Sequence, residues 1–182
     1  MRGAGVVSLV VLFWVFIILF GVIGAMRGWS KEVLVTSSLV MGLFLNAILG
    51  NYVSFYQNLL TSETASTQFI LLTLPLVLLA FAGYQSPRLT ALQGKLARER
   101  IEGILLGLVV GLLNGYLLVG SILFYLHATG YPTSLIAAPP EGSELAVQLQ
   151  NMMGYMPPAL LIIPYVYFAV AAISILIIVV FV

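Results

Sequence analysis

The chain has 182 residues, of which 62% are hydrophobic and only 7% are charged, and its mean hydropathy is +1.14. A soluble domain carries about a quarter charged residues, so this composition excludes a soluble globular protein and indicates a chain that lies in a bilayer. One histidine and no cysteine exclude disulfide frameworks, thiol chemistry and metal sites built from these residue types. A net charge of +1 with only seven scattered basic residues excludes a nucleic-acid-binding face.

Five apolar stretches reach or approach the roughly 20 residues that a membrane-spanning helix needs. They cover about 4–26, 33–50, 68–84, 104–127 and 159–182. The first is longer than the hydrophobic region of a secretory signal, so we interpret it as a retained helix. The pattern of the second continues through Tyr52 and Tyr56 to Leu59, which predicts that this helix runs on into an interfacial segment. The chain is therefore predicted to be an all-α, polytopic membrane helix bundle of about five transmembrane helices.

Basic residues gather in two of the connections between these stretches. Arg27 and Lys31 follow the first stretch and four more lie between residues 85 and 102, whereas only Arg2 lies at the opposite end. Cytoplasmic loops of membrane proteins carry an excess of Lys and Arg. We therefore expect the N-terminus outside the cytoplasm and the C-terminus inside.

Two connections have amphipathic patterns. Between residues 85 and 100, three leucines recur at helical spacing beside basic side chains, which predicts a short helix that lies on anionic lipid. In the outer connection 128–158, Ser143 or Glu141 lies near a helix start, Glu144 follows in the first turn and apolar residues recur on one face. That pattern predicts a second helix, which rests on the outer membrane surface.

Glycines repeat at helical spacing on two of the predicted helices. They are Gly103, Gly107, Gly111 and Gly115 on the fourth, and Gly21, Gly24 and Gly28 at the end of the first. Glycine costs about 1 kcal/mol in a helix interior relative to alanine, so the repeat needs a compensating reason. In lipid, small residues let two helix backbones approach closely. We expect the two faces to pack against each other within the chain, and the alternative is an interface with a partner or a second copy.

Few polar residues interrupt the predicted membrane helices. Asn46 and Asn114 lie near the middle of the second and fourth stretches, where an amide facing lipid is costly. We expect a hydrogen bond between them; the alternative is a polar path for a solute, as in a small channel or transporter. Ser121 and His127 point to different sides of one helix and lack a nucleophile motif, so we expect no enzymatic activity and no cofactor. His127 is interpreted as an interfacial residue, with a pigment ligand as the alternative.

Two stretches resemble the colicin V production protein (CvpA) family. Residues 20–49, FGVIGAMRGWSKEVLVTSSLVMGLFLNAIL, are similar to its N-terminal signature, an apolar helix that leads into Gly-x-x-Arg-Gly-x-x-x-Glu and a second helix. In this chain those positions are Gly24, Arg27, Gly28 and Glu32. Residues 100–126, RIEGILLGLVVGLLNGYLLVGSILFYL, are similar to the family's last, glycine-rich helix. The signature marks a corner between the first two helices, and we expect a nearby cation to hold Glu32.

The resemblance covers residues 4–127 and implies a small inner-membrane protein with a core of four spanning helices. Family members are linked to bacteriocin production or export and to envelope maintenance, without known enzymatic chemistry. We therefore divide the chain into a CvpA-like core at 1–127, an outer loop at 128–158 and a fifth membrane helix at 159–182. The alternative function is an accessory or scaffold subunit of a larger membrane complex, for example a bioenergetic one, which binds other membrane proteins or a second copy.

Overall fold

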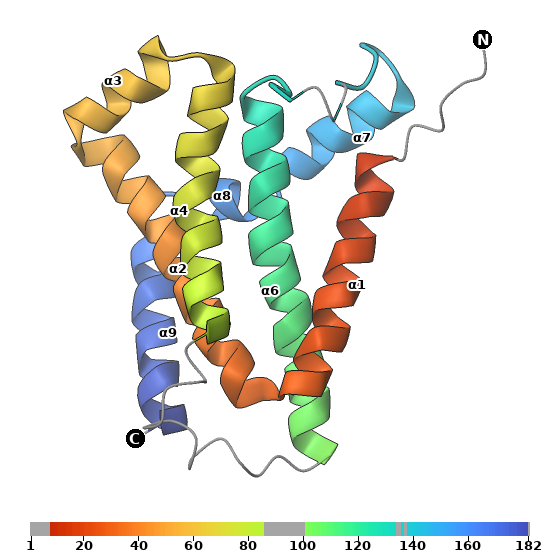
Figure 1. Cartoon of the computed structure of the whole chain (residues 1–182), viewed down its shortest axis with the longest axis vertical. Coiled ribbons are helices and arrows are strands. Elements are labelled where there is room, and N and C mark those ends of the chain that lie inside the picture. The colour runs from red at the N-terminus through yellow and green to blue at the C-terminus, as the bar shows by residue number, and fades with distance from the viewer. Residues whose placement is uncertain (1–7, 86–100, 134–135, 137, 182) are drawn as a thin grey trace.

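A computed structural model describes residues 8–85, 101–133, 136 and 138–181 of the chain, and over these residues it contains helices and no strand (Figure 1). Four helices are long and apolar enough to cross a membrane: α1 (Leu9–Arg27), α2 (Trp29–Tyr52), α4 (Ala65–Gln85) and α6 (Ile101–Ala128). The others are α3 (Ser54–Ser62), α7 (Glu144–Met153), α8 (Pro157–Leu160) and α9 (Tyr165–Phe181). The predicted all-α class is confirmed for these residues, and the length and composition of the four helices support the predicted multi-pass character. The predicted lipid-bound helix between residues 85 and 100 lies outside the described residues.

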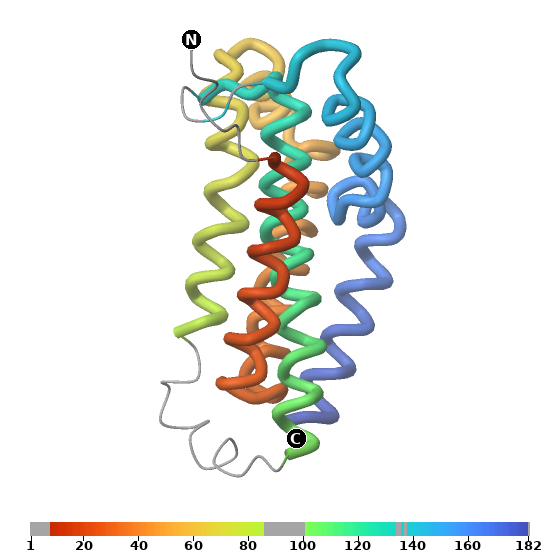
Figure 2. Tube along the Cα trace, turned by 90° about the vertical axis from the view of Figure 1, so that its right-hand side faces the viewer, coloured from red at the N-terminus to blue at the C-terminus, as the bar shows by residue number. Residues whose placement is uncertain are grey.

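The long helices lie side by side along the long axis of the molecule (Figures 1 and 2). The corner between α1 and α2, the start of α6 and the end of α9 lie at one end, which we call the corner end. Helices α3 and α7 lie at the opposite end, which we call the α7 end. Many large apolar side chains on α1, α4, α6 and α9 are exposed, as expected for helices surrounded by lipid.

The second predicted helix does not run on into the interfacial segment, so that expectation is wrong. Helix α2 ends at Tyr52, and Val53 has an extended backbone with φ −109° and ψ 99°. Helix α3 then starts in a new direction (Figure 1). This turn lets the hydroxyl of Tyr56 donate a hydrogen bond to the carbonyl of Leu71 in α4, 3.0 Å away. A tertiary hydrogen bond therefore accompanies a break that the apolar pattern did not reveal.

The fifth predicted helix starts later than expected. Helix α9 begins at Tyr165, because residues 161–164 interrupt it, and Pro164 disfavours helical backbone at the residue before it. The segment Glu144–Leu160 and α9 meet at an angle of 59°. The 17 residues of α9 extend about 26 Å, slightly less than the roughly 30 Å of a bilayer core. The part of the chain that the structure describes thus has four candidate spans, or five if the bent pair counts as one.

Two groups of buried side chains form the core. One lies among α2, α4, α6 and α9 and includes Leu39, Leu43 and Leu76. The other joins α1, α6 and α7 and includes Phe13 and Leu149. The amphipathic helix α7 is present as predicted, and the side chain of its cap residue Ser143 accepts a hydrogen bond from the backbone of Ala146. Its buried face fastens α7 to the open end of the α1–α6 pair (Figure 1).

Candidate functional site

The corner between α1 and α2 brings together the residues that carry the CvpA resemblance. Gly28 has a φ of +87°, a conformation that glycine adopts easily and other residues rarely do. This turn places Arg27, the last residue of α1, beside Glu32 in the first turn of α2. The two side chains form an ion pair, in which Arg27 Nη1 donates to Glu32 Oε1. The Glu32 side chain is fully buried, whereas that of Arg27 is 22% exposed.

The second carboxylate oxygen of Glu32 binds helix α6. Asn114 Nδ2 donates to Glu32 Oε2 at 2.8 Å and lies 3.0 Å from the Glu32 backbone carbonyl. Thr36, one turn further along α2, donates from Oγ1 to Asn114 Oδ1 at 2.7 Å. Both Asn114 and Glu32 have no exposed surface. The carboxylate therefore has a donor on each oxygen, which offsets part of the cost of burying its charge.

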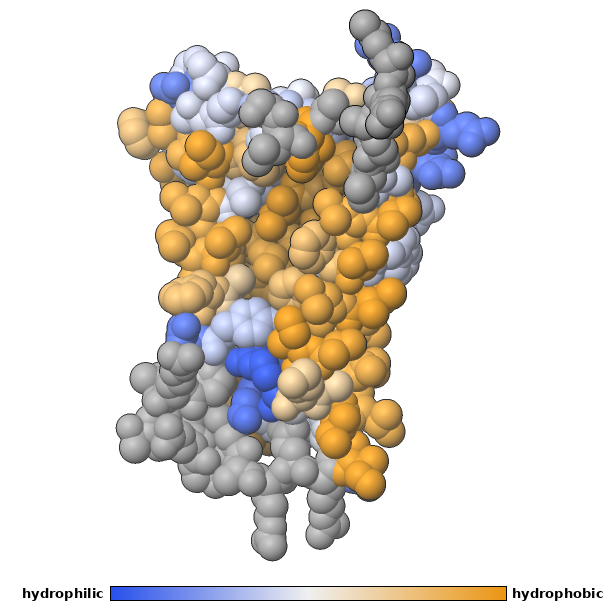
Figure 3. All heavy atoms as spheres, turned by 45° about the vertical axis from the view of Figure 1, so that its right-hand side comes forward, coloured by the Kyte–Doolittle hydropathy of each residue, from blue (hydrophilic) through white to orange (hydrophobic). Residues whose placement is uncertain are grey.

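Helix α4 completes this site through Tyr84. The guanidinium of Arg27 lies over the Tyr84 ring, with 4.4 Å between Cζ and the ring centroid, and Nη2 donates to the Tyr84 carbonyl at 3.2 Å. Such a cation–π contact stabilises a partly desolvated guanidinium. We call Arg27, Glu32, Thr36, Tyr84 and Asn114 the corner cluster. In Figure 3 hydrophilic side chains interrupt an otherwise largely hydrophobic face in the half of the molecule near the corner end.

The expected hydrogen bond between Asn46 and Asn114 is wrong, because each amide has other partners. Asn46 Nδ2 donates to the Leu72 carbonyl at 2.7 Å and to the Tyr125 hydroxyl at 3.2 Å. Asn114 instead pairs with a carboxylate, and hydrogen bonds to charged acceptors are stronger than those between neutral amides. We call Asn46, Tyr56 and Tyr125 the outer cluster.

Apolar side chains separate the two clusters. Leu39 and Leu43 lie between Thr36 and Asn46 on α2, and both are buried. Thr36 and Asn46 are ten residues apart, or about 15 Å along the helix. On α2, buried leucines therefore separate Asn46 from Thr36, the residue that binds Asn114. This arrangement disfavours the expectation of a channel lined by both amides.

The glycines of α1 and α6 lie against each other at the crossing of these helices. A Cβ atom at Gly24 would lie 2.2 Å from the Gly107 carbonyl oxygen, and one at Gly107 would lie 2.4 Å from the Gly24 oxygen. A Cβ at Gly111 would lie 2.4 Å from the Phe20 oxygen. Such distances leave no room for any side chain. The two predicted glycine faces thus meet within the chain.

The remaining predicted glycines lie along the same contact. Gly115 lies against Ile17 and Gly103 is buried, while Gly21 lies against the side chain of Leu112. Leu112 therefore packs against α1. Its side chain fills the space that Gly21 leaves.

The sequence analysis missed a second close contact, between α2 and α4. A Cβ atom at Gly42 would lie 3.2 Å from the Leu76 Cα, and one at Gly83 would lie 3.0 Å from the Val35 Cα. Gly83 is the single glycine of α4 and Gly42 is eight residues from Gly50 in α2, so neither belongs to a repeat with four-residue spacing. The polar partners Thr36, Tyr84 and Tyr125 were missed as well, because threonine and tyrosine are common in membrane helices.

Ser121 and His127 do not form a pair. Ser121 is buried and its hydroxyl donates to the Leu117 carbonyl of its own helix. His127 Nδ1 lies 2.9 Å from the Tyr131 hydroxyl, and Nε2 lies 3.0 Å from Gln150 Oε1 in α7. Burial raises the pKa of the Tyr131 phenol above its ordinary value. His127 therefore links the end of α6 to α7.

The buried charges of this site hold helices together. The described residues contain no group of three His, Asp or Glu side chains that could hold a metal ion. The one buried carboxylate among them is held by a guanidinium and an amide, so it connects α1, α2 and α6. Comparison with protein-family models, with curated proteins and with solved structures finds no match to this chain.

Proposed function

We propose that this chain is a non-enzymatic, multi-pass protein of the bacterial inner membrane, of the CvpA type. It acts through helix packing and protein contacts in bacteriocin production or export, or in envelope maintenance. The observation that carries the proposal is the structure of the corner between α1 and α2. The positions of the CvpA signature, Gly24, Arg27, Gly28 and Glu32, are the ones that form the turn, the ion pair and the close helix crossing.

The chemistry of the interior supports a scaffold. Both oxygens of Glu32 and both donors of the Asn46 amide group have partners within the protein. A group held this way stabilises the fold and is poorly placed to bind or transform a substrate. The protein then acts through its surface, which in the bilayer is apolar and meets other helices by close packing.

The proposed orientation places the corner end in the cytoplasm. Arg27 and Lys31 lie there, and the basic segment 85–100 connects two helix ends on the same side. An excess of basic residues favours the cytoplasmic side, where they bind anionic lipid. Helices α3 and α7 then lie outside the cytoplasm.

Deletion of the gene in its host, followed by complementation, tests the proposed function. Bacteriocin released into the medium and survival in detergent report on export and on the envelope. We expect the deletion to lower at least one of them, wild type to restore it, Glu32→Gln to restore it only partly, and Glu63→Gln in the exposed α3–α4 connection to restore it fully. Unchanged release and survival in the deletion strain contradict the proposal.

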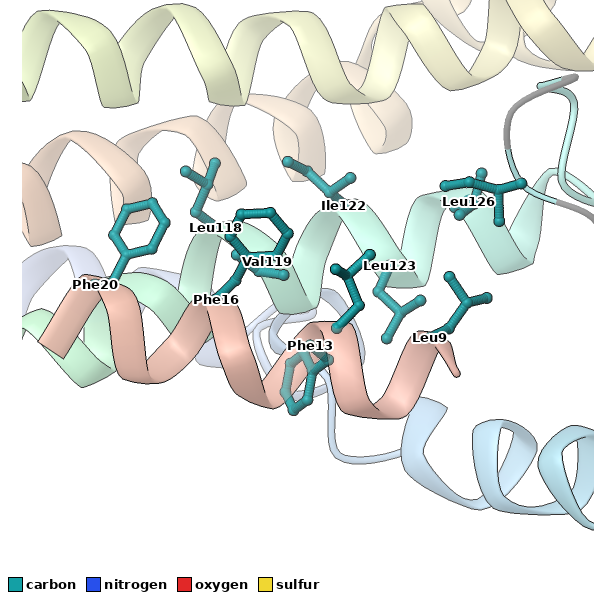
Figure 4. Close-up of a pocket in the computed structure, with 11 residues that line it drawn as sticks. Leu9, Phe13, Phe16, Phe20, Leu118, Val119, Ile122, Leu123 and Leu126 are labelled. Carbon is teal, nitrogen blue, oxygen red and sulfur yellow. The ribbon is translucent and has the colours of Figure 1, made fainter. Parts of the chain in front are cut away.

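A second candidate function is an accessory subunit of a larger membrane complex, and the surroundings of α1 favour it. Helix α1 packs mainly on α6, and an apolar cleft lies on each side of it. Their volumes are about 290 and 520 Å³. Figure 4 shows the first cleft, with Phe16 and Phe20 of α1 facing Leu118 and Ile122 of α6. Helices of another protein can pack into these apolar clefts.

Purification in mild detergent separates the two candidates. An accessory subunit co-purifies with larger subunits in a fixed stoichiometry, and photo-crosslinking from Ile18, which is 59% exposed on α1, joins it to one of them. A protein of the first kind purifies without such subunits. Crosslinks from Ile18 to lipid alone contradict the accessory role.

A further inference from the structure

A recess of about 400 Å³ lies between α2, α6 and the interruption that separates α8 from α9. Its polar lining residues are Asn46, Asn51 and Tyr125, and its apolar walls include Leu43, Leu161 and Ile163. We call it the polar recess. Pockets for small molecules have volumes of about 300–1,000 Å³, so the recess is large enough to hold part of a ligand.

The hydroxyl of Tyr125 supplies a hydrogen-bond donor to this recess. The Tyr125 side chain is 5% exposed, and its oxygen accepts a hydrogen bond from Asn46. Among the described residues no acceptor takes its own hydroxyl proton. A buried donor without an acceptor costs about 1–3 kcal/mol, and this one lines a space in which an acceptor can be placed.

The interruption of the last helix contributes to the same recess. Leu161, Ile162 and Ile163 line it and belong to the non-helical residues before α9. At membrane depth, irregular backbone is tolerated where it is buried in protein or borders a cavity, and interrupted helices recur at binding sites in membrane proteins. Asn46 lies six residues, or about 9 Å, before the end of α2. The recess is therefore in the half of the bundle nearer the α7 end, and Ile162 in its lining is 52% exposed on the surface of the protein.

The lining determines the class of ligand. No charged side chain contributes to the recess, so an ion would be unbalanced there. We propose that the recess binds an uncharged amphipathic molecule from the bilayer, whose carbonyl or hydroxyl oxygen accepts the proton of Tyr125. Its apolar part lies against Leu43, Leu161 and Ile163. A membrane glycerolipid and a quinone share this chemistry.

This binding site goes beyond the proposed function, and it uses none of the corner cluster. If the protein is a scaffold that binds no ligand, water occupies the recess. The two ideas can therefore fail separately, because the complementation experiment reads export and envelope integrity while ligand binding is measured on purified protein.

Equilibrium binding to the full chain, purified in detergent and delipidated, tests the proposal. The probes are decylubiquinone, which carries ring carbonyls, and dioctanoylglycerol, which carries ester carbonyls and a hydroxyl. Tyr125→Phe removes only the donor, and Ala47→Phe fills the recess from its α2 wall. Tyr131→Phe is the matched control, because it removes a tyrosine hydroxyl that bonds His127 outside the recess.

We expect one probe to bind saturably at one site per chain. Its affinity falls about tenfold in Tyr125→Phe, falls further in Ala47→Phe and is unchanged in Tyr131→Phe. The probe that binds identifies the source of the oxygen. Binding of neither probe to a folded wild-type protein, or equal affinity in wild type and both recess variants, overturns the proposal and leaves a recess that holds water or bulk lipid only.

Discussion

At the scale of single residues, the burial of Glu32 governs the chemistry of the bundle. A carboxylate without exposed surface is tolerated only if its charge is balanced and its oxygens are hydrogen-bonded. Arg27 supplies the charge and Asn114 the second donor. Because these partners belong to different helices, any change at Glu32 acts on the joint between α1, α2 and α6.

We predict that Glu32→Gln lowers the free energy of unfolding by about 1–3 kcal/mol, because Arg27 loses its counter-charge while the amide keeps part of the hydrogen bonding. Thermal unfolding of the purified protein in detergent measures the change. Glu63→Gln, in an exposed connection, should leave the midpoint where it is. Equal midpoints for the two variants would mean that the ion pair contributes nothing to the fold.

We also predict that Asn114→Leu destabilises the protein, because it leaves Glu32 Oε2 without a donor and leaves the Thr36 hydroxyl only the Glu32 backbone carbonyl, 3.0 Å away, as an acceptor. Interhelical hydrogen bonds in membranes contribute about 0.6 kcal/mol on average, and a charged acceptor places this one near the upper limit of about 1.7 kcal/mol. A double-mutant cycle with Glu32→Gln measures the coupling. Additive effects of the two substitutions contradict a direct bond.

Sequence reasoning found the residues of the corner but not all of its contacts. Glu32, Arg27 and Asn114 stand out because polar residues are rare in these helices. Their pairing depends on how α2 and α6 are rotated and shifted against each other, which spacing within one helix does not determine. The sequence therefore predicts a bond between Asn46 and Asn114, whereas in the structure Asn114 binds the Glu32 carboxylate and Asn46 binds the Tyr125 hydroxyl.

At the scale of helices, contact distances decide the meaning of the glycine repeat. We predict that Gly107→Leu and Gly111→Leu destabilise the protein by about 1–3 kcal/mol each, because even a Cβ atom at either position would lie 2.4 Å from a backbone oxygen of α1. Leu105→Phe is the control, since this side chain is 63% exposed on the same helix. Unfolding in detergent measures all three. Wild-type stability of both glycine variants contradicts the helix crossing.

Helix α7 allows a separate test. We predict that Leu149→Ala, which empties a fully buried position between α7, α1 and α6, costs about 2–5 kcal/mol locally and releases α7 before the bundle unfolds. Hydrogen exchange should accelerate in α7 and stay unchanged in α2 and α4. The control Val147→Ala is 54% exposed and should leave exchange in α7 as it is. Uniform acceleration across the chain contradicts the view that α7 is a separate layer.

Hydropathy located the helices better than it located their ends. Long apolar stretches predict α1, α2, α4 and α6, because a bilayer leaves the backbone few alternatives to a helix. The break at Val53 lies where apolar residues continue at helical spacing, and the break at 161–164 lies within apolar sequence. Their causes are tertiary: the hydroxyl of Tyr56 reaches α4, where Pro75 cannot donate a backbone hydrogen bond to the Leu71 carbonyl, and the residues before α9 border the polar recess.

At the scale of the whole molecule, polar groups are divided between the two halves of the bundle. The corner cluster fastens α1, α2, α4 and α6 near one end, and the outer cluster fastens α2, α4 and α6 nearer the other. Buried leucines fill the space between them. This division makes a rigid joint at the corner end and leaves the more open features, the α1 clefts and the polar recess, toward the α7 end.

The basic residues at the corner end also predict which end of the molecule lies in the cytoplasm. We expect a cysteine introduced at Ser62, exposed at the end of α3, to react in intact cells with a thiol reagent that cannot cross the membrane. A cysteine at Glu102, exposed at the start of α6 and at the corner end, should react only after the cells are opened. The chain has no native cysteine, so each label reports one position. The basic residues favour this orientation because the cytoplasmic side retains them during insertion. Labelling of Glu102→Cys but not Ser62→Cys in intact cells reverses the orientation, and it would place the α1 clefts and the polar recess in the cytoplasmic half of the bilayer.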